Sequence, residues 1–494
     1  MTNVCIIATI VIYLVGMLLV GFVYSKSNED STDFYLGGRK MGPLVTAMSA
    51  EASDMSSWLL MGLPGLAYLT GIASPGWTAI GLAVGTWLNW LIVARRLRRY
   101  SANLDAITVP QFLSLRFHDQ RNLLNALGAV IIIVFFIPYT ASGFAACGKL
   151  FHSLFGVDYM IAMIVSALVI VGYTILGGFR AVTTTDLIQS VVMSIALVAV
   201  LAYGIGVAGG WGAVMENARS LSGYLTMAAS HDAAAGTASY SLLDIVSTMA
   251  WGLGYFGMPH IIIRFMSLKS EKELRKSSVI GIAWTTVILI MSALTAVAGR
   301  LYLGEIADSS TVFITMVRKI FPALVSGLLL SAILSAAMST ADSQLLAASS
   351  AFASDVYKPV FRKKASDKEM LWAGRIVVII IAVVALLIAS NPNSGTIMGL
   401  VENAWGVFGA AFGPVILLSL FWKRFTFGGA VAGIAVGALV DIGWLLLLHS
   451  TGIYEIVPGF AAGLLAAVVV SLLNKKGPGK EVEALFDRAA QPEK

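Results

Sequence analysis

Charge is scarce in this sequence. Only 12% of the 494 residues are Asp, Glu, Lys or Arg, and 58% are hydrophobic, whereas soluble globular proteins carry about a quarter of charged residues. A chain this apolar excludes an ordinary water-soluble domain and indicates the lipid bilayer as its surroundings. The net charge of +6 does not indicate nucleic acid as a partner, because the basic residues lie in short loops between apolar runs.

Cysteine and histidine are also scarce. Cys5 and Cys147 lie far apart in apolar runs, which excludes a disulfide framework and a cysteine-based metal site. The five histidines, His260 among them, are scattered, and we interpret them as structural. The sequence contains no recognisable nucleophile–base pair and no glycine-rich phosphate loop. It therefore predicts neither an enzyme nor a nucleotide-driven pump.

The sequence does contain a long series of apolar runs. The first, Val4–Val23, can span a hydrocarbon core of about 30 Å. It lacks a basic leading segment and a small-residue cleavage site, so we interpret it as a retained helix and not as a signal peptide. We predict an all-α membrane protein with thirteen transmembrane helices, near 4–24, 42–66, 72–97, 122–148, 157–177, 186–208, 240–262, 277–301, 320–350, 370–390, 397–420, 427–448 and 453–473.

The basic residues predict the orientation. Most of the 33 Lys and Arg residues lie in the C-terminal tail or in the loops that follow the odd-numbered helices. The exceptions are Lys149, Arg219, Arg300, Arg318 and Lys319. Because short cytoplasmic loops are enriched in Lys and Arg, we expect the N-terminus outside and the C-terminus in the cytoplasm. The predicted location is the plasma membrane, which is the inner membrane of a bacterium, as a multi-pass protein.

The span at 42–66 departs from the plain apolar pattern. It contains two carboxylates, Glu51 and Asp54, among several serines, followed by Gly62 and Pro64. A charge at bilayer depth costs at least about 2.5 kcal/mol, so it must face protein, water or an ion. Glycine and proline predict an interrupted helix, whose freed backbone groups are tolerated in a membrane where they line a cavity or bind a ligand.

The span at 240–262 has a similar departure. Gly252, Gly254, Gly257 and Pro259 lie within eight residues. Small residues can also serve close helix packing, and that alternative stays open for a single segment. Two interrupted spans, five helices apart, favour two structural repeats with a transporter binding site at their interface.

Hydroxyl side chains form a stripe in the span at 320–350. Ser331, Ser335, Ser339, Asp342 and Ser343 fall on one face at helical spacing. Isolated hydroxyls often bond their own helix backbone, which is the alternative. A stripe that ends in a carboxylate favours oxygen ligands for a small hard cation.

Asp186 is a further candidate, at the cytoplasmic end of the sixth predicted helix. It follows a glycine pair and three threonines. A helix cap is the alternative interpretation.

Several motifs resemble the sodium/solute symporter family, over nearly the whole length. Asp33–Arg39, Tyr173–Ala181, and Arg424 with Gly429, Ala430 and Gly433 resemble family segments. Two further stretches resemble the branch of bacterial sodium/proline symporters, namely Ala52–Gly65 and Trp251–Gly257 with Pro259 and His260.

The resemblance implies a leucine-transporter-type fold with a five-plus-five inverted repeat. The interrupted helices would be the second and the seventh, each the first of its repeat. The implied segments are 1–41 (first peripheral helix and cytoplasmic loop), 42–208 (first repeat, helices 2–6), 209–420 (second repeat, helices 7–11), 421–474 (peripheral helices 12 and 13) and 475–494 (short cytoplasmic tail).

The resemblance also implies sites. It assigns a sodium ion to Ala52, Met55, Ala336, Ser339 and Thr340. It assigns a sodium-linked role or a second ion site to Asp54, Asp186, Asp342 and Ser343. It assigns the substrate to Ser57, Trp58, Tyr139, Trp251, Tyr255, Met258 and Pro259.

The implied function is sodium-coupled uptake of L-proline by alternating access, with Na+ as the coupling ion. An apolar ring with an ammonium group suits aromatic side chains. Glu51, Ser57 and Met258 depart from the residues common in the proline branch. The alternative is therefore a sodium- or proton-coupled symporter of the same fold for another small amino acid, a betaine or a carboxylate. A sensor or a channel is a rival of another class, although the sequence shows no signalling domain.

Overall fold

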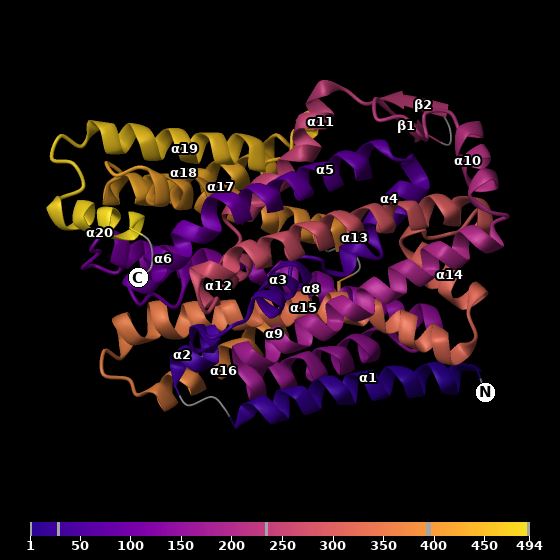
Figure 1. The fold of residues 1–494 in the computed structure, drawn as a ribbon, viewed down its shortest axis with the longest axis horizontal. Helices are drawn as coiled ribbons and strands as arrows, with labels where there is room; N and C mark the ends of the chain where they lie inside the picture. The colour runs from indigo at the N-terminus through magenta and orange to yellow at the C-terminus, as the bar shows by residue number, and fades with distance from the viewer. Residues whose placement is uncertain (1, 27–29, 233–235, 392–396, 492–494) are drawn as a thin grey trace.

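The computed structural model describes residues 2–26, 30–232, 236–391 and 397–491. In this part of the chain the protein is a bundle of long helices that run roughly side by side along the longest axis (Figure 1). The N-terminus lies at one end of this axis and the C-terminus at the other (Figure 1). The expected all-α class is confirmed.

Ten helices among the described residues are long and apolar enough to cross a membrane. They are α1 (Thr2–Ser25); α5 (Ala73–Leu88) continued by the π-helical η3 (Asn89–Ala94) and by α6 (Arg95–Asn103); α8 (Leu123–Phe155); α9 (Tyr159–Val207); η5 (Glu271–Glu273) with α13 (Leu274–Leu303); α15 (Ala323–Ser350) with the π-helical η7 (Ala351–Phe361); α16 (Asp367–Ala389); α17 (Ile397–Phe421); α18 (Phe427–Leu447); and α19 (Ile456–Leu473).

Shorter elements connect or complete these helices. They are α2 (Ser31–Leu36), η1 (Gly37–Arg39), α3 (Pro43–Ala52), η2 (Ser57–Leu59), α4 (Gly62–Thr70), α7 (Val109–Arg116), α10 (Trp211–Ser220), α11 (Leu242–Met249), η4 (Ala250–Phe256), α12 (Pro259–Ser267), η6 (Ser309–Thr311), α14 (Val312–Ile320), η8 (His449–Thr451) and α20 (Lys480–Ala490). A two-stranded antiparallel hairpin, β1 (Ala229–Asp232) and β2 (Gly236–Ser239), pairs Ala229 with Ser239. The sequence did not predict this hairpin.

The difference between thirteen predicted spans and ten long helices has two causes. The predicted spans at 42–66 and 240–262 are each divided into short helices, so neither counts as one long helix. The predicted spans at 157–177 and 186–208 form the single element α9, which bends at Gly178. Gly178 has φ of 61°, a left-handed conformation that glycine adopts easily. A Cβ there would also lie 2.7 Å from the ring of Phe34.

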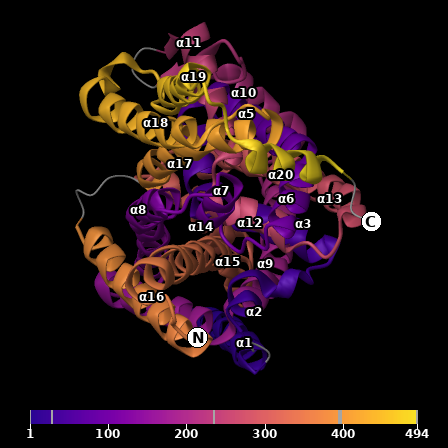
Figure 2. The same ribbon diagram turned by 90° about the vertical axis from the view of Figure 1, so that its left-hand side faces the viewer.

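The helices differ in how much of their surface is buried. α15 and α17 are central, with 78% and 83% of their most apolar segments buried inside the protein. α1, α18 and α19 lie at the periphery (Figure 2), and large apolar side chains such as Ile12, Leu447 and Leu473 are exposed on them. An apolar surface of this extent is suited to lipid.

Glycine residues allow α5 and η4 to approach each other closely, and this contact positions the candidate site. α5 lies against η4, and the backbones nearly touch at Gly81, Gly85 and Gly252. A Cβ on Gly85 would overlap the backbone of Gly252, and a Cβ on Gly252 would overlap that of Gly81. The irregular segment η4 can therefore pack directly on a long helix.

We expect Gly85→Ala to destabilise the protein by about 1–3 kcal/mol, because the added methyl group forces the two backbones apart. Thermal unfolding in detergent, followed by tryptophan fluorescence, should show a midpoint lowered by several degrees. Gly16→Ala on α1 is the matched control, since no described atom outside its own helix lies within 4 Å of the added carbon. Equal midpoints for the two variants would contradict the packing described here.

Candidate functional site

The chain leaves the α-helical path between α3 and α4. α3 ends at Ala52, the short 3-10 turn η2 covers Ser57–Leu59, and α4 begins at Gly62. The whole irregular segment is buried. Backbone N–H groups in it find local partners, since Met55 donates to Glu51 at 3.0 Å and Ser56 donates to Asp54 at 2.8 Å. Carbonyl groups at the end of α3 remain available to other elements.

One of these carbonyls meets α15. The hydroxyl of Ser339 donates to the carbonyl of Ala52 at 2.8 Å, and lies 3.3 Å from the carbonyl of Ala336. The other two residues assigned to sodium lie close by in the sequence. Thr340 follows Ser339 on α15, Met55 lies three residues after Ala52, and both are buried. The structure therefore brings together Ala52, Ser339 and Ala336, three of the five residues assigned to a sodium ion.

Asp54 connects the two irregular segments. The hydroxyl of Tyr255, on η4, donates to a carboxylate oxygen of Asp54. The indole N–H of Trp58 donates to the backbone carbonyl of Asp54 at 3.1 Å. Asp54 and Tyr255 are each 1% exposed, so this hydrogen bond lies away from solvent. The carboxylate beside the candidate ion site is thus bonded to a candidate substrate residue.

Glu51 is bonded to two other parts of the bundle. Its carboxylate accepts hydrogen bonds from the indole of Trp90 and the hydroxyl of Thr285, both at 2.7 Å. Gly281 makes room for it, because a Cβ there would lie 3.1 Å from a Glu51 oxygen. Glu51 is therefore a packed and hydrogen-bonded residue between α3 and α13.

Aromatic rings gather around the second irregular segment. The ring of Trp251 lies 6.2 Å from that of Trp58 and 6.3 Å from that of Trp405. Trp405 also contacts the ring of Tyr255 edge-on at 5.2 Å, and its N–H donates to the carbonyl of Trp251 at 2.7 Å. Gly254 permits this approach, since a side chain there would overlap the indole of Trp405.

The remaining substrate candidates border this group. Tyr139, on α8, faces the ring of His260 at 6.3 Å, and His260 lies 3.2 Å from the carbonyl of Ser53. Ser57 begins η2. Met258 precedes α12, and Pro259 is its first residue; both are buried. Sequence reasoning missed Trp405, which looks like an ordinary aromatic residue of an apolar span.

Several polar atoms in this region are buried without a protein partner. Among the residues that the structure describes, these include the hydroxyl groups of Ser56, Ser57, Tyr139 and Thr340 and the Nδ1 atom of His260. Buried polar groups nearly always have a partner, so each such atom needs an explanation. A ligand with polar groups, bound between the two irregular segments, would supply partners for these atoms.

The candidates for a second ion site form a separate group. Asp186 on α9 accepts a hydrogen bond from Ser49 at 2.6 Å. Asp342 on α15 accepts from Tyr173 at 2.6 Å and from Ser343 at 3.1 Å. The guanidinium of Arg264 lies among them, 3.2 Å from Asp186. The sequence had given Arg264 no role beyond a topology signal.

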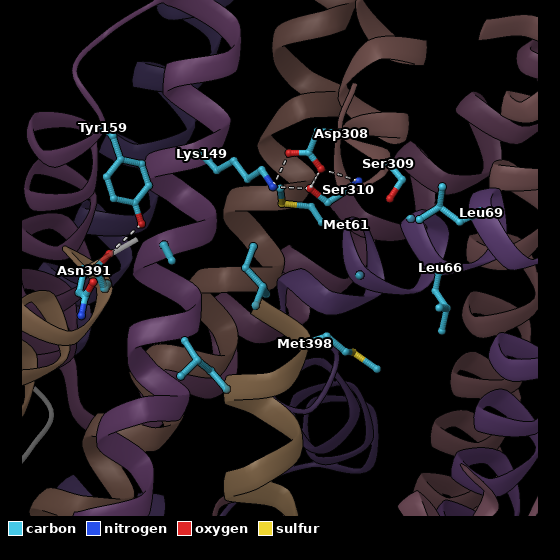
Figure 3. Close-up of a pocket in the computed structure, with 16 residues that line it drawn as sticks. Met61, Leu66, Leu69, Lys149, Tyr159, Asp308, Ser309, Ser310, Asn391 and Met398 are labelled. Atoms are coloured by element: carbon cyan, nitrogen blue, oxygen red, sulfur yellow. Dashed lines mark hydrogen bonds and ion pairs between the residues drawn. The ribbon is translucent and has the colours of Figure 1, made fainter. Parts of the chain in front are cut away.

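Two cavities reach the region from the end of the molecule where α14 and the hairpin lie. The larger, about 690 Å³, is lined by Met61 and Gly62 and bordered by Lys149, Asp308 and Ser310, which bond to one another (Figure 3). The second, about 380 Å³, is lined by Trp251 together with Glu402, Tyr454 and Glu455. Leu66 and Met398 border both cavities.

The ion pair in the larger cavity is well formed. The Lys149 ammonium lies 2.5 Å from Asp308. Partial burial raises the pKa of Asp308, but hydrogen bonds from Lys149 and Ser310 and the charge of Lys149 outweigh it, so this pKa lies below its ordinary value. The pair therefore persists at neutral pH and fixes the loop before η6 against α8.

The model of the sodium:solute symporter family matches residues 34–437. The chain belongs to the sodium:solute symporter family. The family comprises symporters and not enzymes, and sodium is its coupling ion. The match to this family confirms the family that the sequence motifs predicted. It also confirms the prediction of a multi-pass protein of the cell membrane.

Related proteins extend this likeness over nearly the whole chain. The osmoregulated proline transporter OpuE of Bacillus subtilis is 43% identical over 488 residues, which are 97% of this chain and 97% of the relative. A sodium/proline symporter of Staphylococcus aureus is 42% identical over 489 residues, or 96% of this chain and 93% of the relative.

A solved structure shares the fold of this symporter. It is a Na+-coupled sialic acid symporter in a substrate-bound outward-open state, with a TM-score of 0.81, 20% identity, and coverage of 96% of this chain and 98% of that one. The likeness supports the all-helical transporter fold of the leucine-transporter type.

Trp405 donates a hydrogen bond to Trp251 and contacts the ring of Tyr255. We therefore expect Trp405→Ala to raise the KM for the transported solute about tenfold, which corresponds to roughly 1.4 kcal/mol of binding free energy. Trp405→Phe keeps a ring and should raise it less. Solute uptake into proteoliposomes measures both, with Trp87→Ala, at a 49% exposed position, as the control. A KM unchanged in Trp405→Ala would remove this residue from the site.

Proposed function

We propose that this symporter takes up L-proline together with sodium. Its relatives are named proline transporters and sodium/proline symporters. The observation that carries the proposal is the hydrogen bond from Tyr255 to Asp54, because it links the candidate ion site directly to the candidate substrate site.

We also propose thirteen membrane crossings arranged as a five-plus-five inverted repeat. α3 with α4 would form the interrupted second crossing, α11 with α12 the interrupted seventh, and the two parts of α9 the fifth and sixth. The repeats would cover 42–208 and 209–420, with 1–41 and 421–474 peripheral and 475–494 as a tail; residues 492–494 lie outside the described part. Termini at opposite ends of the molecule (Figure 1) support an odd number of crossings, and the distribution of basic residues favours the N-terminus outside.

The proposed sodium site combines carbonyls of the first interruption with hydroxyls of α15. Sodium would replace the hydrogen bond between Ser339 and Ala52 and draw on the carbonyls of Met55 and Ala336. The hydroxyl of Thr340, which has no described partner, is a further ligand. Asp54 stands beside this site and supplies negative charge to it.

The proposed substrate pocket has the chemistry that proline requires. The aromatic faces of Trp58, Trp251 and Tyr255 can pack against the apolar ring, and the ammonium group can lie over one of them, worth about 0.5–2 kcal/mol. Backbone groups freed at the interruptions, with the hydroxyls of Ser57 and Tyr139, can meet the carboxylate. Met258 and Pro259 close the side toward α12.

The two ligands are coupled through the shared segment. Sodium would bridge the end of α3 and α15 in place of their hydrogen bond, and this would order Asp54 and, through it, Tyr255. The substrate site is then complete. By thermodynamic linkage the substrate must tighten sodium binding by the same factor. The membrane potential contributes roughly 2.3 kcal/mol per 100 mV for each charge carried inward.

A different small zwitterion is the second candidate substrate. Ser57 and Met258, which depart from the common proline pattern, are the observations that favour it. The fold and the sodium site would be the same for another amino acid or a betaine.

Uptake of labelled L-proline into proteoliposomes, with and without an inward sodium gradient, tests the proposal. We expect saturable uptake that requires sodium. Uptake that depends on a proton gradient instead would contradict sodium coupling. Sodium-driven uptake of another zwitterion that L-proline does not inhibit would replace the substrate but keep the mechanism.

Two variants test the sodium site. Ser339→Ala removes a ligand, so the sodium concentration for half-maximal uptake should rise roughly tenfold. Asp54→Asn removes the charge beside the site and should abolish sodium-dependent uptake. Ser331→Ala is the matched control on the same helix, because its hydroxyl donates only within α15, to Gly327 at 2.9 Å. Wild-type sodium dependence in both site variants would refute this assignment.

A further inference from the structure

A polar cavity of about 580 Å³ lies apart from the candidate site. Residues of α7, α8, η7 and α20, and of the loop between α7 and α8, line it. Its volume is within the range of about 300–1,000 Å³ that is typical of small-molecule sites. The hydroxyl of Thr108, which caps α7, lies 2.8 Å from both oxygens of Asp355 on η7 and donates to this carboxylate. Two walls of the cavity are therefore fixed against each other.

Two side chains in the walls have buried polar atoms without a partner. Asn125 is 6% exposed and Ser354 is 8% exposed, and both line the cavity. The Oδ1 atom of Asn125 and the hydroxyl of Ser354 have no hydrogen-bond partner among the described residues. The amide nitrogen of Asn125 is already used, since it donates to Asn122 at 3.3 Å. Buried polar atoms nearly always have a partner, so the cavity suits a ligand that carries both a hydroxyl donor and an acceptor oxygen.

The charged side chains of the cavity favour an anion. Lys358 and Lys363 line it, and in the described part of the chain neither forms an ion pair. The carboxylate of Asp119 also lines it, but accepts two backbone N–H groups at the start of α8, at 2.7 and 3.1 Å. Glu481 lies 3.9 Å from the ring of His118 but is 83% exposed, so solvent screens its charge. The two ammonium groups thus remain for a phosphate or another anion.

Apolar side chains at the rim favour a lipid over a free anion. Leu115 lines the cavity and is exposed. Val360 and Phe361 follow the lining residue Pro359, and both are exposed. Leu123, at the start of α8, is exposed as well. Lysines next to exposed apolar side chains are typical of the level where the hydrocarbon core meets the head groups. A lipid with its head group in the cavity would cover these side chains with its acyl chains, whereas a free anion would leave them uncovered.

We propose that this cavity binds the head group of an anionic phospholipid that carries a free hydroxyl, such as phosphatidylglycerol. The phosphate accepts hydrogen bonds from Lys358, Lys363 and Ser354, and the head-group hydroxyl donates to the Oδ1 atom of Asn125. Basic pockets between membrane helices on the cytoplasmic side are suited to anionic head groups. With the orientation proposed above, the lipid belongs to the cytoplasmic leaflet. It joins α7, α8 and η7, and η7 continues α15, the helix that carries Ser339.

Binding of phosphatidylglycerol to the purified full-length protein tests the proposal. Native mass spectrometry from detergent micelles counts the lipid molecules that stay bound as dioleoylphosphatidylglycerol is titrated. We expect one tightly bound lipid for the wild type. Lys358→Gln combined with Lys363→Gln should weaken its binding at least about tenfold, because both charges that face the phosphate are lost.

Lys364→Gln combined with Lys368→Gln is the matched control. It removes the same charge from two exposed residues nearby that do not line the cavity. This pair should bind the lipid as tightly as the wild type does. Equal weakening by the two pairs would show a general attraction of charges and would overturn the proposed site.

A third variant tests the buried wall of the cavity. Asn125→Asp keeps the size of the side chain but places a negative charge beside the phosphate, so tight binding should be lost. The thermal unfolding midpoint without added lipid checks that this variant is folded. Folded Asn125→Asp that binds phosphatidylglycerol as tightly as the wild type would overturn the proposal.

Two further ligands distinguish the source of the anion. Dioleoylphosphatidylethanolamine, which carries no net charge, should bind the wild type at least about tenfold more weakly than phosphatidylglycerol. Glycerol 3-phosphate, which has no acyl chains, should not displace the bound lipid. Equal binding of the two lipids, or displacement by glycerol 3-phosphate, would overturn the proposal of an anionic lipid.

Discussion

A backbone carbonyl that leaves a helix inside a bilayer must find a partner, and in this protein the carbonyl of Ala52 finds it in the hydroxyl of Ser339. The rest of the site follows from this constraint. α15 brings this hydroxyl to the end of α3 from the interior, since it is one of the most buried helices of the bundle. An ion that binds at this contact therefore interacts with both α3 and α15.

The second interruption is tied to the first by side chains. Tyr255 reaches Asp54, and Trp251 contacts Trp58 across the same space. η4 can occupy this position because glycines let it lie directly against α5, and Gly254 lets Trp405 lie against it. The glycines of this segment thus allow close packing and also an irregular backbone. The two interpretations of these glycines, close helix packing and an interrupted helix, are therefore compatible.

Sequence alone predicted much of the fold and the family, because apolar runs, glycine and proline each leave a direct signal. It singled out 42–66 and 240–262, two ranges in which the structure has several short helices. It could not show that α9 is one element bent at Gly178, since a glycine pair between two apolar runs also fits a loop. Short surface helices and the hairpin lack a strong apolar period and were missed.

The contacts within the candidate site could not be predicted from the sequence alone. Ala52 and Ser339 were paired by resemblance, but they are 287 positions apart in the sequence, and their contact depends on how the whole bundle folds. Glu51 departs from the residue common in the proline branch, and only the structure shows that Trp90 and Thr285 bind its carboxylate. Arg264 resembled a topology signal, and only its burial beside Asp186 distinguishes it from the exposed basic residues.

In the proposed mechanism, sodium binding and substrate binding are coupled through the contact between Asp54 and Tyr255. Equilibrium binding of labelled L-proline at low and high sodium, and of radioactive sodium without and with L-proline, measures the coupling factor in both directions. The account predicts equal factors well above one for the wild type, and a factor near one for Tyr255→Phe, which keeps the ring and loses the hydroxyl. Full coupling in Tyr255→Phe would contradict it.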